Sequence, residues 1–192
     1  MTELIKPVRY GILIGLFGLI FGIGWAFWLV LGHERIHASL EKSAVQKEWA
    51  SMHLFEGEIP HVHKEGEMHK EEKSMPHLKD QHENPIFELS HTRLRRGHVH
   101  AMGLGIFTIA LSLALAFTSA PDRIKTIASV LAGLGGIVYP FAWIIMGYRT
   151  PALGTNGAEA SVTTIAGPGV LLVLIGISTA VIFLLKDIFH KK

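Results

Sequence analysis

Four stretches of this 192-residue chain contain no Asp, Glu, Lys or Arg, and they limit its fold more than any other feature. Each is longer than the roughly 20 residues that an α-helix needs to cross about 30 Å of hydrocarbon. Buried helices of soluble proteins are rarely free of charge over this length. We therefore predict an all-α fold, an integral membrane four-helix bundle whose helices cover residues 10–32, 97–120, 126–148 and 161–185.

Charge is concentrated between the first two predicted helices. Of the 34 Asp, Glu, Lys and Arg residues, 22 lie within residues 34–96, and these are 12 acidic and 10 basic side chains. Residues 33–96 are therefore predicted to form a polar, histidine-rich extramembrane segment within a single membrane domain of residues 1–192. Residues 33–50 lack Gly and Pro, which predicts that the first helix continues out of the membrane. Residues 86–96 are predicted to run as a helix into the second one.

The orientation follows from Lys and Arg in short flanking segments, which favour the cytoplasm. The N-terminal flank contains Lys6 and Arg9, the turn after the second predicted helix contains Arg123 and Lys125, and the C-terminal flank contains Lys186. We expect both termini in the cytoplasm and the histidine-rich segment in the periplasm of a bacterial inner membrane. Four arginines also lie beside helix ends on the side predicted to be periplasmic, namely Arg35, Arg93, Arg95 and Arg96. They reduce the difference in positive charge between the two sides.

Composition excludes several classes of function. The formal net charge is +2 and no block of Lys and Arg occurs, so nucleic acid is not an expected partner. Cysteine is absent, which excludes disulfides, cysteine-ligated iron–sulfur clusters and the covalent attachment of c-type haem. The expected surroundings are the lipid bilayer, with other membrane subunits or a second copy of the chain.

A glycine stripe on the first predicted helix indicates close packing. Gly11, Gly15, Gly18 and Gly22 fall on one narrow face at 100° per residue. Small residues let a second helix approach closely in lipid, and they also leave room for a flat macrocycle. In the third predicted helix, Pro140 predicts a kink because proline removes a backbone donor.

The histidines are the main candidates for chemistry, since 11 of the 12 lie within residues 33–100. His33 and His37 share a face at the end of the first predicted helix. His98 and His100 begin the second, about 200° apart, and the smaller, more polar face of His98 favours it as the inward residue. If these two helices are neighbours, the pairs converge at one depth. Imidazoles from two helices suit b-type haem, zinc or copper, whereas the alternative is a set of interfacial histidines at the water boundary.

Residues 33–37 also match H-E-x-x-H, in which two histidines of a helix bind zinc and the glutamate acts as general base. Arg35 occupies an inner position of the motif, and no clear third ligand follows. We interpret this match as coincidental in a histidine-rich stretch.

A second candidate set lies in the extramembrane segment. A thioether stands beside an imidazole at Met52, Met68 and Met75, and this combination is compatible with copper. A solvated charged loop with incidental histidines is the alternative. The candidate metal ligands are His53, His61, His63, His69, His77 and His91.

Residues 97–105, Gly-His-Val-His-Ala-Met-Gly-Leu-Gly, resemble the His-x-His helix start and following Gly/Leu pattern of haem-copper oxidase catalytic subunits and of small four-helix membrane proteins related to them. The resemblance covers one helix and implies that His98 or His100 ligates haem. The chain departs from the pattern because residues 126–185 contain no histidine, so the later ligands of a haem-copper centre are missing. Oxygen reduction by this chain alone is therefore not implied.

Three functions remain open from the sequence. The first is a haem b electron-transfer protein or haem-bearing subunit of a respiratory complex, exchanging electrons with quinol or a larger complex. The second is an outer-face copper- or zinc-binding membrane protein for metal handling or cofactor assembly. The third is an accessory subunit of a membrane complex that binds no cofactor. Whether the chain is an enzyme is left open.

Overall fold

A computed structural model describes residues 2–55 and 85–190, with the side chains of residues 3–46 and 85–189. Four of its helices are long and apolar enough to cross a membrane, in the spans Glu3–Leu31, Pro85–Ala116, Asp122–Ala160 and Thr163–Phe189. The predicted all-α membrane bundle is confirmed. In chain order the elements are α1 (Thr2–Ile5), the 3₁₀ turn η1 (Lys6–Val8), α2 (Arg9–Leu31), α3 (His33–Phe55), α4 (Pro85–Ala116), α5 (Asp122–Ala160) and α6 (Thr163–His190).

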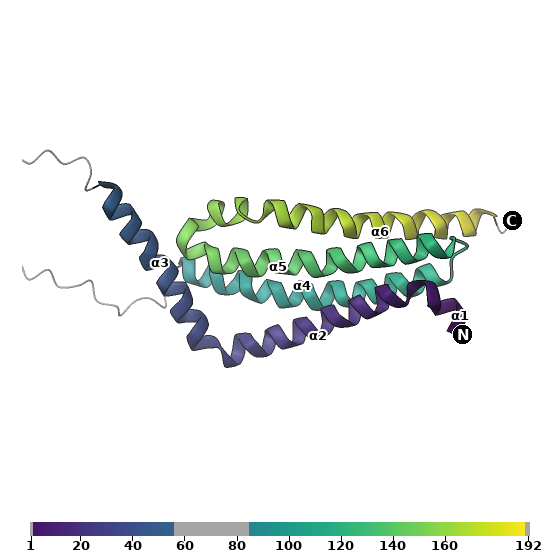
Figure 1. The fold of residues 1–192 in the computed structure, drawn as a ribbon, viewed down its shortest axis with the longest axis horizontal. Coiled ribbons are helices and arrows are strands. Elements are labelled where there is room, and N and C mark those ends of the chain that lie inside the picture. Colours follow the sequence, from purple (N-terminus) through teal and green to yellow (C-terminus); the bar gives the residue numbers. More distant parts are fainter. Residues whose placement is uncertain (1, 56–84, 191–192) are drawn as a thin grey trace, which may run out of the picture.

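The four long helices lie side by side, and α3 leaves one end of the bundle at an angle (Figure 1). α4 and α5 are the inner pair: α2 packs against both, and α6 packs mainly against α5. Half of the most apolar window of α5 is buried, against 17% for α2 and for α6. The outer helices therefore present most of their apolar side chains outward, as helices in contact with lipid do.

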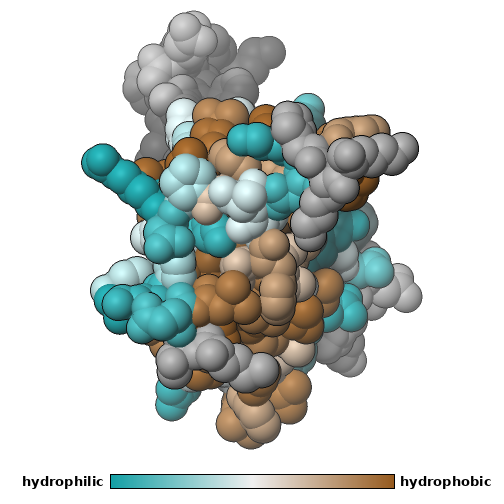
Figure 2. Space-filling model, turned by 90° about the vertical axis from the view of Figure 1, so that its right-hand side faces the viewer, coloured by the Kyte–Doolittle hydropathy of each residue, from teal (hydrophilic) through white to brown (hydrophobic). Residues whose placement is uncertain are grey.

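The chain termini lie at the end of the bundle opposite α3. Figure 2 views the molecule from this end, with hydrophilic side chains mainly at its left and hydrophobic ones at its centre and lower edge. Polar contacts join the segments here. The Lys125 ammonium donates to the carbonyl of Ala116 at 3.1 Å, and the Thr126 hydroxyl donates to the carbonyl of Pro7 at 2.6 Å. Both termini lie at one end, as an even number of spans requires.

The glycine stripe of α2 is a helix-packing surface. Gly11, Gly15, Gly18 and Gly22 are all buried. A Cβ added at Gly15 would lie 2.8 Å from the carbonyl oxygen of Gly105 in α4. Backbone contact at this distance leaves no space for a macrocycle beside the stripe. Of the two sequence-based interpretations, helix packing is the correct one here.

The first predicted helix does not continue straight beyond residue 32. Gly32 ends α2 with φ −95° and ψ 12°, and its N–H donates to the carbonyl of Trp28 at 2.8 Å. Its own carbonyl accepts from the N–H of Ile36 at 2.9 Å, so a new helix begins at once with a changed axis. The new direction lets Ile36 and Leu40 of α3 pack against buried side chains of α4 and α5, namely Phe87, Leu94 and Ile144.

Of two further boundaries, one agrees with the prediction and one differs from it. α4 begins at Pro85, so residues 86–96 are helical and continuous with the membrane span, as expected. α5 reaches Ala160, although residues 149–160 were expected to form a loop. Helical dihedrals within α5 are interrupted at Gly154, with φ 72° and ψ −179°, and not at Pro140. After this break, buried Ala158 packs against Ala142 and Met146, which explains why this glycine-containing stretch is ordered as helix.

Candidate functional site

The end of the bundle that carries α3 contains two cavities, one on each side of α4. The first, which we name the histidine cavity, has a volume of about 640 Å³ and lies between α2, α3 and α4. Apolar side chains of α2 form one wall, and histidines with two charged residues form the others. Its lining residues are Ala26, Leu29, Val30, His33, His37, Phe87, Glu88, His91, Arg95 and His98.

Three imidazoles gather within the histidine cavity. The ring centres of His33 and His37 are 5.5 Å apart, those of His33 and His91 are 5.5 Å apart, and those of His37 and His91 are 5.1 Å apart. The ring of Phe87 stacks on His37 at 6.1 Å with an interplanar angle of 13°. The three rings thus form a nearly equilateral triangle with an aromatic support on one side.

The helices position these side chains by simple periodicity. His33 and His37 are one turn apart at the start of α3, so they share a face. Glu88, His91 and His98 lie on a common face of α4, since separations of 3 and 7 residues return to the same side of a helix. The bend at Gly32 turns the face of α3 toward α4, and the two sets meet.

Two buried nitrogen atoms belong to residues that line the histidine cavity. Nε2 of His91 and Nδ1 of His98 have no hydrogen-bond partner among the side chains and backbone that the structure describes. Buried polar atoms in native proteins are nearly always paired, because an unpaired one costs about 1–3 kcal/mol. Both atoms belong to residues that line one cavity, which is the arrangement expected where a ligand binds.

His100 does not belong to the histidine cavity. It lies on the other side of α4, where its ring centre is 5.3 Å from that of Tyr139 and 5.4 Å from that of Trp143. Its Nδ1 is 2.7 Å from the carbonyl oxygen of Arg96. His98 and His100 therefore face different sides, as their spacing predicted, and the prediction that placed His100 in the same candidate site as His33 is not supported by this placement.

The remaining sequence-predicted ligands are outside the described side chains. His53 lies in α3, but its side chain is not described, and His61, His63, His69 and His77 fall within residues 56–84. His91 was grouped with them by sequence, whereas it lies with His33 and His37. The separation of seven residues between His91 and His98 was the signal that could have placed it correctly. Glu34 of the H-E-x-x-H match does not line the cavity.

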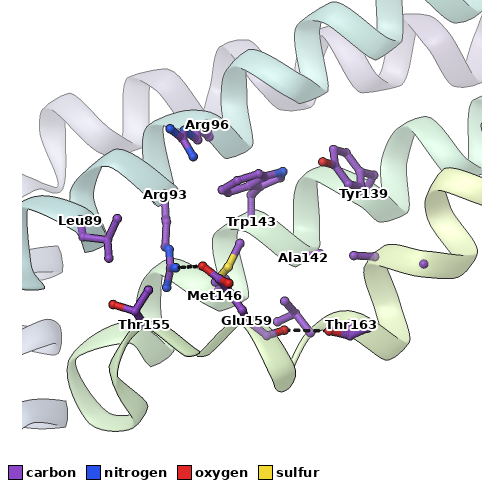
Figure 3. Close-up of a pocket in the computed structure, with 13 residues that line it drawn as sticks. Leu89, Arg93, Arg96, Tyr139, Ala142, Trp143, Met146, Thr155, Glu159 and Thr163 are labelled. Carbon is purple, nitrogen blue, oxygen red and sulfur yellow. Dashed lines mark hydrogen bonds and ion pairs between the residues drawn. The ribbon is translucent and has the colours of Figure 1, made fainter. Parts of the chain in front are cut away.

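The second cavity, which we name the arginine cavity, lies between α4, α5 and α6 and has a volume of about 400 Å³ (Figure 3). Arg93 is buried at 3% side-chain exposure, donates to the Thr150 hydroxyl at 2.9 Å and forms an ion pair with Glu159. The Arg96 guanidinium lies over the ring of Trp143, 5.1 Å from its centre. The wall is completed by Leu89, Tyr139, Ala142, Met146, Thr155, Val162, Thr163, Ala166 and Gly167.

Chemically, the histidine cavity offers imidazole nitrogens and no sulfur from the described residues that line it. Imidazole is a ligand for zinc, copper, iron and nickel. As the side chains stand, no group of three or more His, Cys, Asp or Glu in residues 2–55 and 85–190 is arranged to hold a metal ion. Binding would require the rings to turn about χ1 and χ2, and the histidine χ2 torsion is broad and soft.

Comparison of the chain with protein-family models, with curated proteins and with solved structures gives no match. The likeness to haem-copper oxidase subunits at residues 97–105 therefore stays a prediction. The two cavities and the residues that line them are the features from which we infer a function.

Proposed function

We propose that this chain is a transition-metal-binding integral membrane protein that holds a divalent zinc or copper ion in the histidine cavity. His33, His37 and His91 would be the ligands, and His98 would orient or complete the site. The ring triangle with sides of 5.1–5.5 Å is the observation that supports this function most directly. A role in metal handling or cofactor assembly at the membrane boundary follows from a site at the end of the bundle.

Ring spacing favours an ion over haem. Zinc–imidazole bonds of about 2.0–2.1 Å with tetrahedral angles put the ring centres of neighbouring ligands roughly 5.2 Å apart. Two imidazoles on opposite faces of one iron would have ring centres roughly 6.4 Å apart for the same bond length. The ring-centre separations of 5.1 and 5.5 Å agree with the first arrangement. The second would need the rings to separate and admit a macrocycle between them.

The charged residues of the cavity modify its affinity. Glu88 contributes an oxygen donor and Arg95 a positive charge to the lining. A carboxylate near ligating imidazoles raises their basicity when it accepts a ring N–H, and such partners change metal affinity by about 10–100-fold. We therefore expect Glu88 to accept a ring N–H from a ligating histidine and so to strengthen metal binding.

Haem b is the second candidate, and one observation favours it. The cavity volume of about 640 Å³ is larger than a bare ion needs, and His98, which also lines it, has a buried and unpaired Nδ1. In that case His98 would be one axial ligand and a histidine of α3 the other. An optical spectrum of the purified protein with and without dithionite distinguishes the two, because a sharp α-band after reduction identifies low-spin haem.

The test of the metal site uses full-length protein in detergent, stripped with a chelator and titrated with Zn²⁺ or Cu²⁺. We expect one ion per chain at the cavity with micromolar or tighter affinity, measured by calorimetry and by metal analysis after desalting. His37→Ala and His91→Ala should each weaken binding by at least about tenfold. His100→Ala is the control, since His100 also lies on α4, two residues after His98, but outside the histidine cavity.

Histidines of residues 56–84 can also bind metal, so the test also needs a variant of the protein that lacks them. In a variant with Ala at all five of them, namely His61, His63, His69, His77 and His82, binding to the cavity should persist. If these replacements remove all binding while His37→Ala and His91→Ala leave it unchanged, the proposed site is wrong. If no variant binds metal or haem, the accessory-subunit hypothesis becomes the appropriate one.

A further inference from the structure

We propose that the arginine cavity is a binding site for an anionic lipid, with its oxyanion headgroup on Arg96 and its acyl chain along the apolar wall between α5 and α6. The headgroup class is a carboxylate or a phosphate attached to a hydrocarbon chain. This site is independent of the histidine cavity, because it lies on the opposite side of α4 and shares none of its lining residues.

The charges of the cavity do not balance. Its lining contains the guanidinium groups of Arg93 and Arg96 and the carboxylate of Glu159. Arg93 is paired with Glu159, whereas Arg96 forms no ion pair within the described part of the chain and only lies over the face of Trp143. Within the described lining, one positive charge is left over at the membrane boundary, where an anionic lipid headgroup would supply a counter-ion.

The shape and polarity of the arginine cavity fit an amphiphilic ligand. Figure 3 shows Arg96, Arg93 and Trp143 on one side of the cavity, and Met146, Ala142 and Thr163 around the rest. The part of the wall formed by Ala142, Met146, Val162 and Ala166 is apolar. A volume of about 400 Å³ accommodates part of a chain rather than a whole two-chain lipid, so the remainder would extend along the outside of α6.

The side chains around Arg96 hold it in place for this role. The indole of Trp143 lies between α4 and α5 with the His100 ring stacked on it at 5.4 Å and an interplanar angle of 17°. Arg96 lies over the same indole system at 5.1 Å. A cation–π contact directs the guanidinium without neutralising its charge, so the planar N–H fork remains able to bind an oxyanion with two hydrogen bonds.

Neutral quinones are the competing occupants of such a cavity. A quinone would depend on apolar contacts and on hydrogen bonds from Tyr139 or Thr163, and loss of one positive charge would change its affinity little. Arg96, which forms no ion pair with a residue of 3–46 or 85–189, favours the anionic ligand. Dependence on the charge of Arg96 therefore separates the two classes.

The experiment uses the purified full-length protein in a neutral detergent and two brominated probes, dibromostearate and dibromo-phosphatidylglycerol. Bromine quenches a nearby indole, and the signal of Trp143 is the difference between wild type and Trp143→Phe. We expect saturable quenching by at least one probe. Arg96→Gln should weaken that binding about fivefold, the effect of one basic side chain at an anionic membrane surface. Dibromo-phosphatidylcholine, which has no net charge, should bind wild type as weakly as the anionic probe binds Arg96→Gln.

Two variants control this experiment. Arg95→Gln removes the adjacent positive charge on the same helix, but Arg95 lines the histidine cavity, so binding should stay unchanged. Ala166→Phe fills the apolar part of the arginine cavity and should abolish quenching of Trp143 while Arg96 is intact.

Quenching by the carboxylate probe alone identifies a free fatty acid, and quenching by the phosphate probe identifies a phospholipid. Equal binding to wild type and Arg96→Gln, or tighter binding of a neutral brominated quinone to both, would overturn the proposal.

Discussion

At the scale of single residues, Gly105 determines how closely α2 and α4 approach. A Cβ at this position would lie 2.8 Å from the carbonyl oxygen of Gly15 and 2.9 Å from the backbone nitrogen of Leu19. Both are backbone atoms, so neither can move without shifting a whole helix. In lipid, where hydrophobicity does not drive helices together, such close backbone contact supplies much of the association energy.

Replacement of Gly105 tests this contact. Gly105→Val should lower the stability of the bundle by about 1–3 kcal/mol, because the added methyl groups overlap the backbone of α2. Gly103→Ala is the control, since a Cβ at Gly103 would meet nothing within 4 Å. It should be neutral or stabilising by up to about 1 kcal/mol through helix propensity. Thermal unfolding of both variants in detergent measures the difference, and equal melting temperatures would contradict the packing account.

At the scale of elements, α4 presents its arginines to two sides. Arg93 and Arg96 line the arginine cavity, where Arg93 pairs with Glu159, whereas Arg95 lines the histidine cavity. Rotation of 100° per residue along one helix produces this distribution. By joining α4 to the helical turns after Gly154, the Arg93–Glu159 pair fixes the end of α5 beside the arginine cavity.

Replacing Glu159 in this ion pair should lower the stability of the protein more than replacing Arg93. Glu159→Gln leaves the buried guanidinium of Arg93 without its counter-ion and should destabilise by about 1–3 kcal/mol. Arg93→Met leaves only a carboxylate that is 58% exposed and stays hydrated, so the loss should be smaller. In the Arg93→Met background, Glu159→Gln should have almost no further effect. Melting temperatures of the four proteins form a double-mutant cycle. A larger loss of stability from Arg93→Met alone than from Glu159→Gln alone would contradict this expectation.

At the scale of the whole molecule, both candidate sites lie at the end of the bundle where α3 leaves it, and the chain termini lie at the other end (Figure 1). The charge distribution of the flanking segments predicts that the termini are cytoplasmic. Both sites would then face the outer side of the membrane. An ion or a lipid arriving from that side could enter without crossing the bilayer.

Cysteine labelling tests the orientation directly, because the native chain has no cysteine. Cysteine introduced at Ser43 in α3, or at Ser74, should react with a membrane-impermeant thiol reagent added to intact spheroplasts. Cysteine at Ser119, an exposed position between α4 and α5, should react only after lysis. The reverse pattern would place both candidate sites on the cytoplasmic side.

The sequence by itself determined the membrane bundle and the region of its candidate site. Charge-free stretches of more than 20 residues can satisfy their backbone groups in hydrocarbon only as helices, so composition alone specifies the spans. The spacing of His33 and His37, and the opposite directions of His98 and His100, follow from the helical period. These are local properties. The structure agrees with the four spans and with these histidine directions, although α5 extends beyond the predicted residue 148 to Ala160.

Only the tertiary structure decided which faces of the helices contact one another. The turn at Gly32 depends on Ile36 and Leu40 packing against α4 and α5, which no periodicity within α3 reveals. That turn brings His33 and His37 to His91 rather than carrying them away along a straight helix. Likewise, the break at Gly154 and the burial of Ala158 place Glu159 beside Arg93, 66 residues earlier in the chain. Contacts between distant residues arise from packing of whole helices, and a pattern read along one helix contains no information about its neighbour.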